Sequence, residues 1–252
     1  MAVISVVLLV SLVSAGYSAN PAQRSPTAQL KVCTTGDYLP LTYYDPGTGR
    51  YRGIDIEMAG NLAAHLGRTA VFVRTTWTTL MKDLSTPGKC DIAMGGISVT
   101  ADRQRQAEFT EPYLSNGKTP LTTTAHAQQF QTLQQINVKG VSVIEDAGGT
   151  NDAFVRQRLP NVTLAISADN MAVFGQLLAG KADLMITDSI EAVYEAGQHP
   201  GLVAVHPGTP FTADRKAYLL PKNSDLTGQV DAWLAEALGD GTFTRFYHQW
   251  MS

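Results

Sequence analysis

Short apolar segments alternate with helical patterns twice along the chain, and this alternation constrains the fold more than any other feature. In the first half, the strand patterns lie at residues 30–34, 70–74 and 91–94, and the helical patterns at 59–66 and 77–84. In the second half, the strand patterns lie at residues 141–144, 162–166 and 182–187, and the helical patterns at 152–159, 171–178 and 190–196. Such alternation predicts largely parallel sheets with helices on both faces. We therefore expect an α/β protein with two lobes in series.

Two further segments are expected to connect these lobes. Residues 119–124 lead from the first lobe to the second, and residues 217–220 can return to the first. A pair of crossings is typical of a hinge protein with a cleft. We predict lobe 1 at residues 29–119 and 218–252 and lobe 2 at residues 120–217, with two helices broken at 239–241 in the tail. Ligands of open α/β sheets bind beyond the carboxyl ends of the strands, which places the ligand site between the lobes.

The amino terminus has the pattern of an export signal. Residues 3–13 form an apolar run that is too short to span a bilayer and that leads into a polar, proline-containing linker. We predict that residues 1–28 are signal peptide and linker, and that the protein is periplasmic without stable membrane insertion. No Lys or Arg precedes the run, so a buried N-terminal helix or strand is the alternative. The net charge of −3, with mixed signs along the chain, argues against a nucleic-acid partner.

The two cysteines, Cys33 and Cys90, each lie in a predicted strand segment. Export would permit a disulfide between them, whereas two buried free thiols are the alternative. Two thiols alone do not supply a four-ligand zinc site. The sequence also contains no Walker loop, dinucleotide fingerprint, zincin motif or nucleophile elbow.

Two glycine-containing turns predict a carboxylate site. After the strand pattern at 91–94, two glycines precede Ser98, Thr100 and Arg103, which together offer hydroxyls, free backbone N–H groups and a guanidinium. Arginine binds a planar carboxylate through two parallel bonds, and helix N-termini attract anions. Gly149 and Thr150 repeat the arrangement in the second lobe. The alternatives are a surface arginine paired with an acidic neighbour and an ordinary helix cap.

Two acidic residues, Asp188 and Glu191, follow the strand pattern at 182–187. We expect Asp188 to cap the next helix, to bind a ligand ammonium, or to do both, with Glu191 on the same side of the first turn. Asp-x-x-Glu is also a capping-box pattern, so a purely structural role is the alternative. Lys118, in an Asn-Gly-Lys turn at the first crossing, either reaches into the cleft or is solvated.

Three residues at strand ends complete the candidate site. Asp37 and Tyr38 follow the first strand pattern, where they either contact a ligand or form an ordinary turn. Trp77 lies where the strand pattern at 70–74 leads into a helix. It either stacks on a ligand ring or packs in the core.

The order of these segments resembles the polar amino-acid family of periplasmic solute-binding proteins. The matching pieces are GDYLPLTYYD, YRGIDIEMAGNLA, DIAMGGISVTADRQRQAEFTEPY, GGTNDAF and GKADLMITDSIEA. The resemblance implies a type II periplasmic-binding-protein-like fold, α/β, with two lobes joined by a two-strand hinge. It also implies that Arg103, Thr150 and the Gly148–Gly149 backbone hold an α-carboxylate and that Asp188 matches the family's ammonium-binding aspartate.

Several stretches are similar to the cyclohexadienyl dehydratases within that family, above all NGKTP and ITDSIEA. That similarity implies an active-site lysine at Lys118 and a general acid at Glu191. The implied reaction is the decarboxylating dehydration of prephenate or arogenate. Formation of the aromatic ring drives it, so we expect no metal and no organic cofactor. The alternative is an amino-acid-binding protein that delivers its ligand to an ABC permease, which gives no joint role to these two residues.

Overall fold

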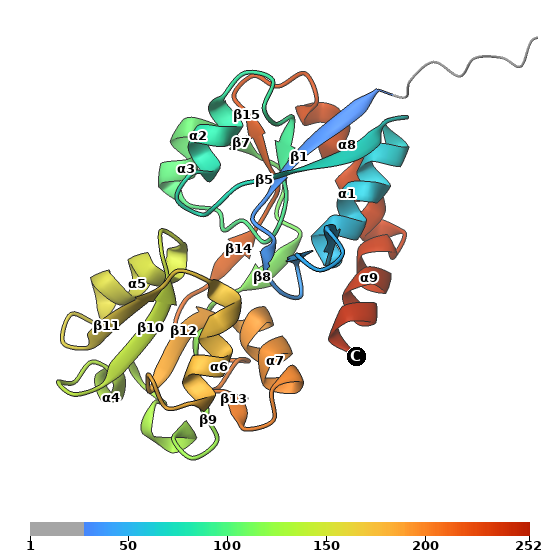
Figure 1. Cartoon of the computed structure of the whole chain (residues 1–252). Helices are drawn as coiled ribbons and strands as arrows, with labels where there is room; N and C mark the ends of the chain where they lie inside the picture. The colour runs from blue at the N-terminus through green and yellow to red at the C-terminus, as the bar shows by residue number, and fades with distance from the viewer. Residues whose placement is uncertain (1–27) are drawn as a thin grey trace, which may run out of the picture.

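Two α/β lobes lie one beyond the other in the structure, a computed structural model that describes residues 28–252 (Figure 1). Each lobe contains one five-stranded sheet with helices packed on it. The predicted two-lobed α/β architecture is therefore confirmed. The predicted signal segment, residues 1–28, lies outside the described residues except for its last position.

The sheet of lobe 1 has the strand order β5-β1-β6-β15-β7. Its strands are β1 (Gln29–Thr34), β5 (Thr69–Arg74), β6 (Ile92–Ala93), β7 (Ala107–Phe109) and β15 (Leu219–Pro221). β1 pairs in parallel with β5 and β6, whereas β15 pairs antiparallel with β6 and β7. The sheet is mixed because β15, which returns from lobe 2, enters it in the opposite direction.

Helices pack on both faces of this sheet (Figure 1). On one face lie α1 (Ile54–His65), α8 (Thr227–Gly239) and α9 (Thr242–Met251), whose apolar side chains share one core with β1 and β6. On the other face lie α2 (Leu80–Ser85) and α3 (Ala101–Gln106). Beneath α2, Cys33 and Cys90 form a disulfide with their Cα atoms 5.6 Å apart, within the usual range. The disulfide, and not the pair of free thiols, is the alternative that the structure supports.

The sheet of lobe 2 has the strand order β11-β10-β12-β9-β13. Its strands are β9 (Lys118–Thr123), β10 (Ser142–Asp146), β11 (Thr163–Ser167), β12 (Leu184–Asp188) and β13 (Leu202–Ala204). Around it lie α4 (Leu133–Ile136), α5 (Thr150–Arg158), α6 (Val173–Leu178), α7 (Ser189–Gln198) and the short 3₁₀ helices η1 (Ala127–Gln129) and η2 (Asn170–Ala172). β10, β11 and β12 run parallel, and β9 is antiparallel to β12.

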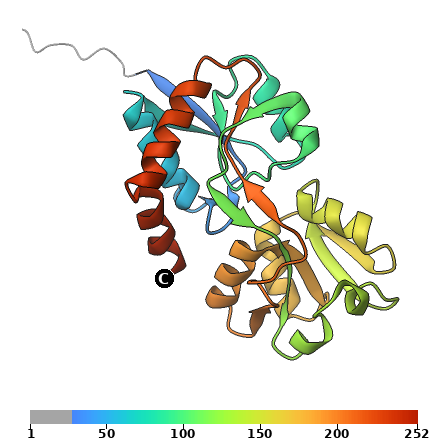
Figure 2. The same cartoon turned by 180° about the vertical axis from the view of Figure 1, so that it is seen from behind.

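Two short antiparallel strands, β8 (Leu114–Asn116) and β14 (Asp214–Lys216), cross between the lobes, as the view from behind shows (Figure 2). Both crossings lie a few residues before the positions expected from the sequence. The expected first crossing, 119–124, falls mostly within β9, which pairs with both β12 and β13 inside lobe 2. The expected return, 217–220, leads into β15 of lobe 1.

A small three-stranded sheet completes lobe 1 at the cleft. Its strands are β2 (Asp37–Tyr38), β3 (Thr42–Asp45) and β4 (Arg50–Arg52), and they pair antiparallel in the order β2-β3-β4. β2 directly follows the turn at the carboxyl end of β1. It therefore presents the Tyr38 side chain toward lobe 2.

Candidate functional site

The carboxyl ends of β1, β6, β10 and β12 meet the hinge strands between the lobes, and a pocket lies there. Its volume is about 20 Å³, roughly the space of one water molecule. The residues that line it are Tyr38, Trp77, Gly96, Ser98, Arg103, Asp146, Gly149, Thr150, Asn151, Asn170, Asp188 and Lys216. Because this volume is far too small for an organic acid, the lobes must separate about the hinge to admit one.

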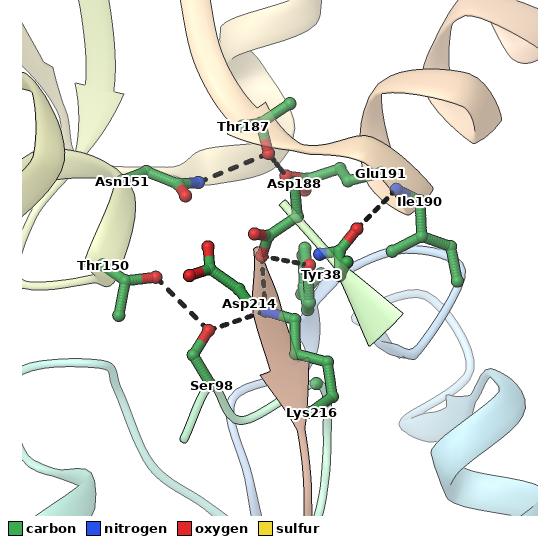
Figure 3. A network of polar contacts seen from close by, with 12 residues as sticks. Tyr38, Ser98, Thr150, Asn151, Thr187, Asp188, Ile190, Glu191, Asp214 and Lys216 are labelled. Carbon is green, nitrogen blue, oxygen red and sulfur yellow. Dashed lines mark hydrogen bonds and ion pairs between the residues drawn. The ribbon is translucent and has the colours of Figure 1, made fainter. Parts of the chain in front are cut away.

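Asp188 lies at the centre of a polar network that joins both lobes and the hinge (Figure 3). Its Oδ1 accepts a hydrogen bond of 2.8 Å from Nζ of Lys118, and its Oδ2 accepts bonds from Nζ of Lys216 and the hydroxyl of Tyr38. Burial by itself raises the pKa of Asp188, but the two ammonium groups outweigh burial and lower that pKa below its ordinary value. The carboxylate is therefore ionised, and both of its oxygens are occupied.

Lys118, the first residue of β9, belongs to the interlobe network and not to a solvated turn. It is 2% exposed, and its Nζ also donates to Oγ1 of Thr150 at 2.8 Å and to Oδ1 of Asn151. With Asp188, these contacts use all three donors of the ammonium group. Lys118 therefore ties the hinge end of β9 to the start of α5.

Lys216 is a second buried lysine, and the sequence analysis did not identify it. It is 1% exposed at the end of β14, and its Nζ donates to Oγ of Ser98 at 2.8 Å as well as to Asp188. Burial lowers the pKa of Lys216, and the Asp188 carboxylate opposes this effect. The available signal was a lysine directly before the apolar return segment at 217–220, where a buried strand would otherwise exclude charge.

Arg103 is held inside the cleft by α3. Its Nη1 donates to the backbone oxygen of Ser98 at 3.0 Å, and its guanidinium carbon lies 6.0 Å from the centre of the Trp77 ring. Burial lowers the pKa of Arg103 to about 10, so the side chain remains cationic at neutral pH. The alternative of a surface ion pair is not formed, because Asp102 pairs with Arg105 instead.

Glu191, in the first turn of α7, is fully buried at 0% exposure. Its Oε1 accepts a hydrogen bond of 3.1 Å from Asn170, and its Oε2 accepts one from the Thr187 hydroxyl. The helix has no side-chain capping bond at Asp188, so the capping-box alternative is not formed. Burial raises the pKa of Glu191 well above its usual value, and the nearby Glu195 raises it further, while the Thr187 bond opposes both. This environment favours the protonated, proton-donating form.

Other carboxyl groups of lobe 2 share this bias toward the neutral form. Asp146 lines the pocket at the end of β10, and burial raises its pKa to about 7. Glu195 lies one helical turn after Glu191, and burial raises its pKa to about 8. Burial also raises the pKa of Glu145 well above its usual value. The cleft is therefore rich in cations relative to ionised carboxylates.

The three strand-end residues do not all face the pocket. Tyr38 and Trp77 do, with their rings edge to face and 5.9 Å apart between centres. The Asp37 carboxylate instead lines a neighbouring pocket beside Arg74, and the Asp37 backbone oxygen accepts a hydrogen bond of 2.8 Å from Asn170 of lobe 2. Asn170 thus joins Asp37 of one lobe to the general-acid candidate of the other, and the sequence analysis did not identify it.

Two glycines permit the close approach around the pocket. Gly148 has φ +81°, and a Cβ there would lie 2.2 Å from Cγ2 of Thr78 in the other lobe. Gly96 has φ +72°, and a Cβ there would lie 2.2 Å from the Tyr38 ring. A side chain at Gly148 would be strained and would hold the lobes apart, whereas one at Gly96 would be strained and would collide with the Tyr38 ring inside lobe 1.

Neither a metal site nor a membrane span emerges from the part of the chain that the structure describes. Residues 28–252 contain no group of three or more His, Cys, Asp or Glu side chains placed to hold a metal ion. In the same range, no helix combines the length and apolarity needed to cross a bilayer.

Two lobes that close over a buried, charged pocket define the class of two-lobed solute-binding proteins. The chain belongs to the bacterial extracellular solute-binding proteins, family 3, whose model matches residues 30–252. Cyclohexadienyl dehydratase of Pseudomonas aeruginosa is 45% identical over 222 residues, which are 88% of this chain and 82% of that protein. The L-cystine-binding protein of Escherichia coli is 26% identical over the same shares of the two chains.

Solved structures agree with this assignment. An ancestral amino acid-binding protein, described as a precursor of cyclohexadienyl dehydratase, matches with a TM-score of 0.82 and 32% identity over 89% of this chain and 96% of its own. An ancestral cyclohexadienyl dehydratase matches with a TM-score of 0.54 and 44% identity over 89% of this chain and 92% of its own. The type II periplasmic-binding-protein fold expected from the sequence is therefore confirmed.

Proposed function

We propose that the protein is a cyclohexadienyl dehydratase, which converts prephenate to phenylpyruvate or arogenate to phenylalanine. The observation that carries the proposal is the fully buried carboxyl of Glu191, whose pKa burial raises well above its usual value. The buried cations of the cleft, Lys118 and Lys216, are bonded to Asp188 and do not ionise Glu191. The 45% identity to the Pseudomonas aeruginosa enzyme supports it. A carrier binds and releases an amino acid without transferring a proton to it, so its function requires no protonated acid at this position.

The cations of the cleft suit the carboxylates of such a substrate. We assign the side-chain carboxylate to Arg103, Thr150 and the Gly149 backbone, because these groups line the pocket from both lobes and Arg103 has donors beyond its single bond to Ser98. Lys118 and Lys216 supply positive charge near the ring carboxylate. The substrate is thereby oriented before any bond changes, which is a large part of what such a site contributes.

Proton delivery then completes the reaction. Glu191 gives its proton to the ring hydroxyl, the ring C–O bond breaks, and the hydroxyl departs as water. The bond between the ring and its carboxylate breaks as well, at the ring carbon opposite the one that loses the hydroxyl. Carbon dioxide leaves, and the electron pair of that bond completes the aromatic ring. No oxidant or reductant is consumed. A positioned acid of this kind typically contributes about 10²–10⁴-fold in rate.

Asn170 controls access to the acid. It lines the pocket, donates to Glu191 and also donates to the Asp37 backbone across the cleft. Opening of the lobes breaks the bond to Asp37 and leaves Asn170 held only by lobe 2. A substrate that enters can then displace Asn170, and its hydroxyl takes over the contact with Glu191.

We place this activity in the periplasm. The family is described as extracellular, and the apolar run at residues 3–13 has the length of a signal sequence. The disulfide between Cys33 and Cys90 suits an oxidising compartment.

Incubation of the purified protein with prephenate at neutral pH tests the proposal. We expect phenylpyruvate to accumulate, followed by its absorbance in alkali, without added metal or cofactor. A protein that forms no product from prephenate or arogenate, and that binds an amino acid tightly by calorimetry, would be a transport protein instead.

A further inference from the structure

We infer that Lys216 determines substrate specificity: with Lys118 and Tyr38 it occupies Asp188, so that the pocket accepts an ammonium-free 2-oxo dicarboxylate in preference to the corresponding amino acid. The inference rests on the proposed function and selects between its two substrates. It predicts that prephenate is preferred over arogenate.

Asp188, the residue expected from the sequence to bind a ligand ammonium, is already paired with two lysines. Its Oδ1 accepts from Lys118, and its Oδ2 accepts from both Lys216 and Tyr38. The carboxylate is 3% exposed. A substrate ammonium that displaces either lysine leaves that lysine unpaired in the cleft, and an unpaired buried charge is costly. One that displaces the Tyr38 hydroxyl adds a third positive charge beside a single carboxylate.

The cleft holds more cationic side chains than ionised carboxylates. Three cationic side chains, Arg103, Lys118 and Lys216, surround one ionised carboxylate, Asp188. The general-acid candidate Glu191 is neutral in its working form. The excess positive charge matches the two carboxylates of prephenate, whereas arogenate adds a positive charge to a region that already has an excess of it.

Asp146 is the other carboxyl that lines the pocket, and it offers an alternative site for an ammonium group. Burial raises its pKa to about 7, and the nearby Asp37 and Asp152 raise it further, while Lys118 opposes them. Asp146 therefore spends much of its time neutral at physiological pH. It is a weaker partner for an ammonium than an ionised carboxylate such as Asp188.

Steady-state kinetics with both substrates test the inference on the wild-type protein. We expect kcat/KM for prephenate to exceed that for arogenate by at least about tenfold, the usual scale of one charge-assisted hydrogen bond. Equal use of the two substrates, or a preference for arogenate, would overturn the inference and leave the proposed dehydratase function standing. An arogenate preference that disappears in Asp146→Asn would identify Asp146 as the ammonium site and overturn it equally.

Replacement of Lys216 tests whether this side chain causes the preference for prephenate over arogenate. Lys216→Met removes one ammonium group and leaves Oδ2 of Asp188 bonded to the uncharged Tyr38 hydroxyl, which makes room for a substrate ammonium. The ratio of kcat/KM for prephenate to that for arogenate should therefore fall by at least about tenfold. Lys222→Met, at an exposed lysine, is the matched control and should keep the wild-type ratio. A folded Lys216→Met protein, judged by circular dichroism, that keeps the wild-type ratio contradicts the inference.

Calorimetry with the matched pair phenylpyruvate and L-phenylalanine separates failure of the inference from failure of the proposed function. These acids differ only in the oxo or ammonium group. If neither cyclohexadienyl substrate is converted, the dehydratase proposal fails, and this pair still tests the site. Tighter binding of phenylpyruvate supports the inference, whereas equal or tighter binding of L-phenylalanine overturns it.

Discussion

At the scale of single residues, the cleft combines two buried lysines that share one ionised carboxylate with other carboxyls that are kept neutral. Lys118, Lys216 and Asp188 are each at most 3% exposed, and burial of such charges is tolerated only because every one of them has a charged partner. Glu191 has no cation among its hydrogen-bond partners. Burial favours the neutral form of both acids, and the two lysines keep Asp188 ionised while Glu191 stays protonated.

Arg103 offers the sharpest residue-scale test of substrate binding. Arg103→Ala should weaken the binding of any carboxylate ligand by about 10-fold to 100-fold, because a buried guanidinium loses its charge-assisted bonds. Isothermal calorimetry with phenylpyruvate measures the change. Arg105→Ala, on the same helix but exposed and paired with Asp102, is the control and should bind normally. Unchanged affinity in Arg103→Ala would remove this residue from the site.

The candidate site could be predicted from the sequence only in part. Spacing after strand ends indicated Arg103 and Thr150, because turns at the carboxyl ends of parallel strands meet at one edge. The roles of Lys118 and Glu191 came from resemblance to a family. Lys216 reaches the cleft through the pairing of β14 with β8, and its one signal in the sequence is its place directly before an apolar segment. No local pattern indicates Asn151 or Asn170.

At the scale of elements, α7 carries a buried acidic face. Glu191 and Glu195 lie one turn apart and are 0% and 1% exposed, and His199 follows one turn later with Nδ1 3.1 Å from Oε2 of Glu195.

The strand patterns at 30–34 and 70–74 correspond closely to β1 and β5. The helix expected at residues 77–84 begins later, at Leu80 in α2. A turn precedes it, in which the Thr76 hydroxyl forms hydrogen bonds with the hydroxyl and the N–H group of Thr79.

The buried acids predict an inverse dependence of stability on pH. Burial raises the pKa of Glu195 to about 8, whereas an unfolded glutamate ionises near pH 4.5, so the folded protein binds more protons between these values. The free energy of unfolding should therefore fall as the pH rises from 5 to 8. Glu195→Gln stays neutral and should flatten this slope in urea denaturation, whereas the exposed control Glu236→Gln should not. Equal slopes for wild type and Glu195→Gln contradict the prediction.

The disulfide between β1 and the start of β6 should contribute strongly to lobe 1. It joins Cys33 and Cys90 across a sequence separation of 57, and chain-entropy arguments give about 4 kcal/mol for a loop of that length. The double variant Cys33→Ala with Cys90→Ala should lose stability of that order in chemical denaturation. Reduction of the wild type with dithiothreitol should produce a similar loss. If neither treatment changes the free energy of unfolding, the disulfide adds no stability.

At the scale of the whole molecule, the two lobes close directly on each other. Tyr38 donates to Asp188 across the cleft, and Asn170 donates to Asp37. The sequence predicted two lobes and a hinge because the α/β alternation occurs twice. The crossings lie earlier than expected because β9 pairs with β12 and β13, and β15 with β6 and β7, inside the lobe sheets, which leaves β8 and β14 as the links.

Closure gives Glu191 its proposed role, because only a site shut off from water holds a carboxyl in its protonated form at neutral pH. The most direct measurement is therefore the turnover of prephenate by Glu191→Gln, beside Glu236→Gln as an exposed control. We predict that kcat for Glu191→Gln falls at least about 100-fold, while calorimetry shows that prephenate still binds. Near-normal turnover by Glu191→Gln would contradict the account.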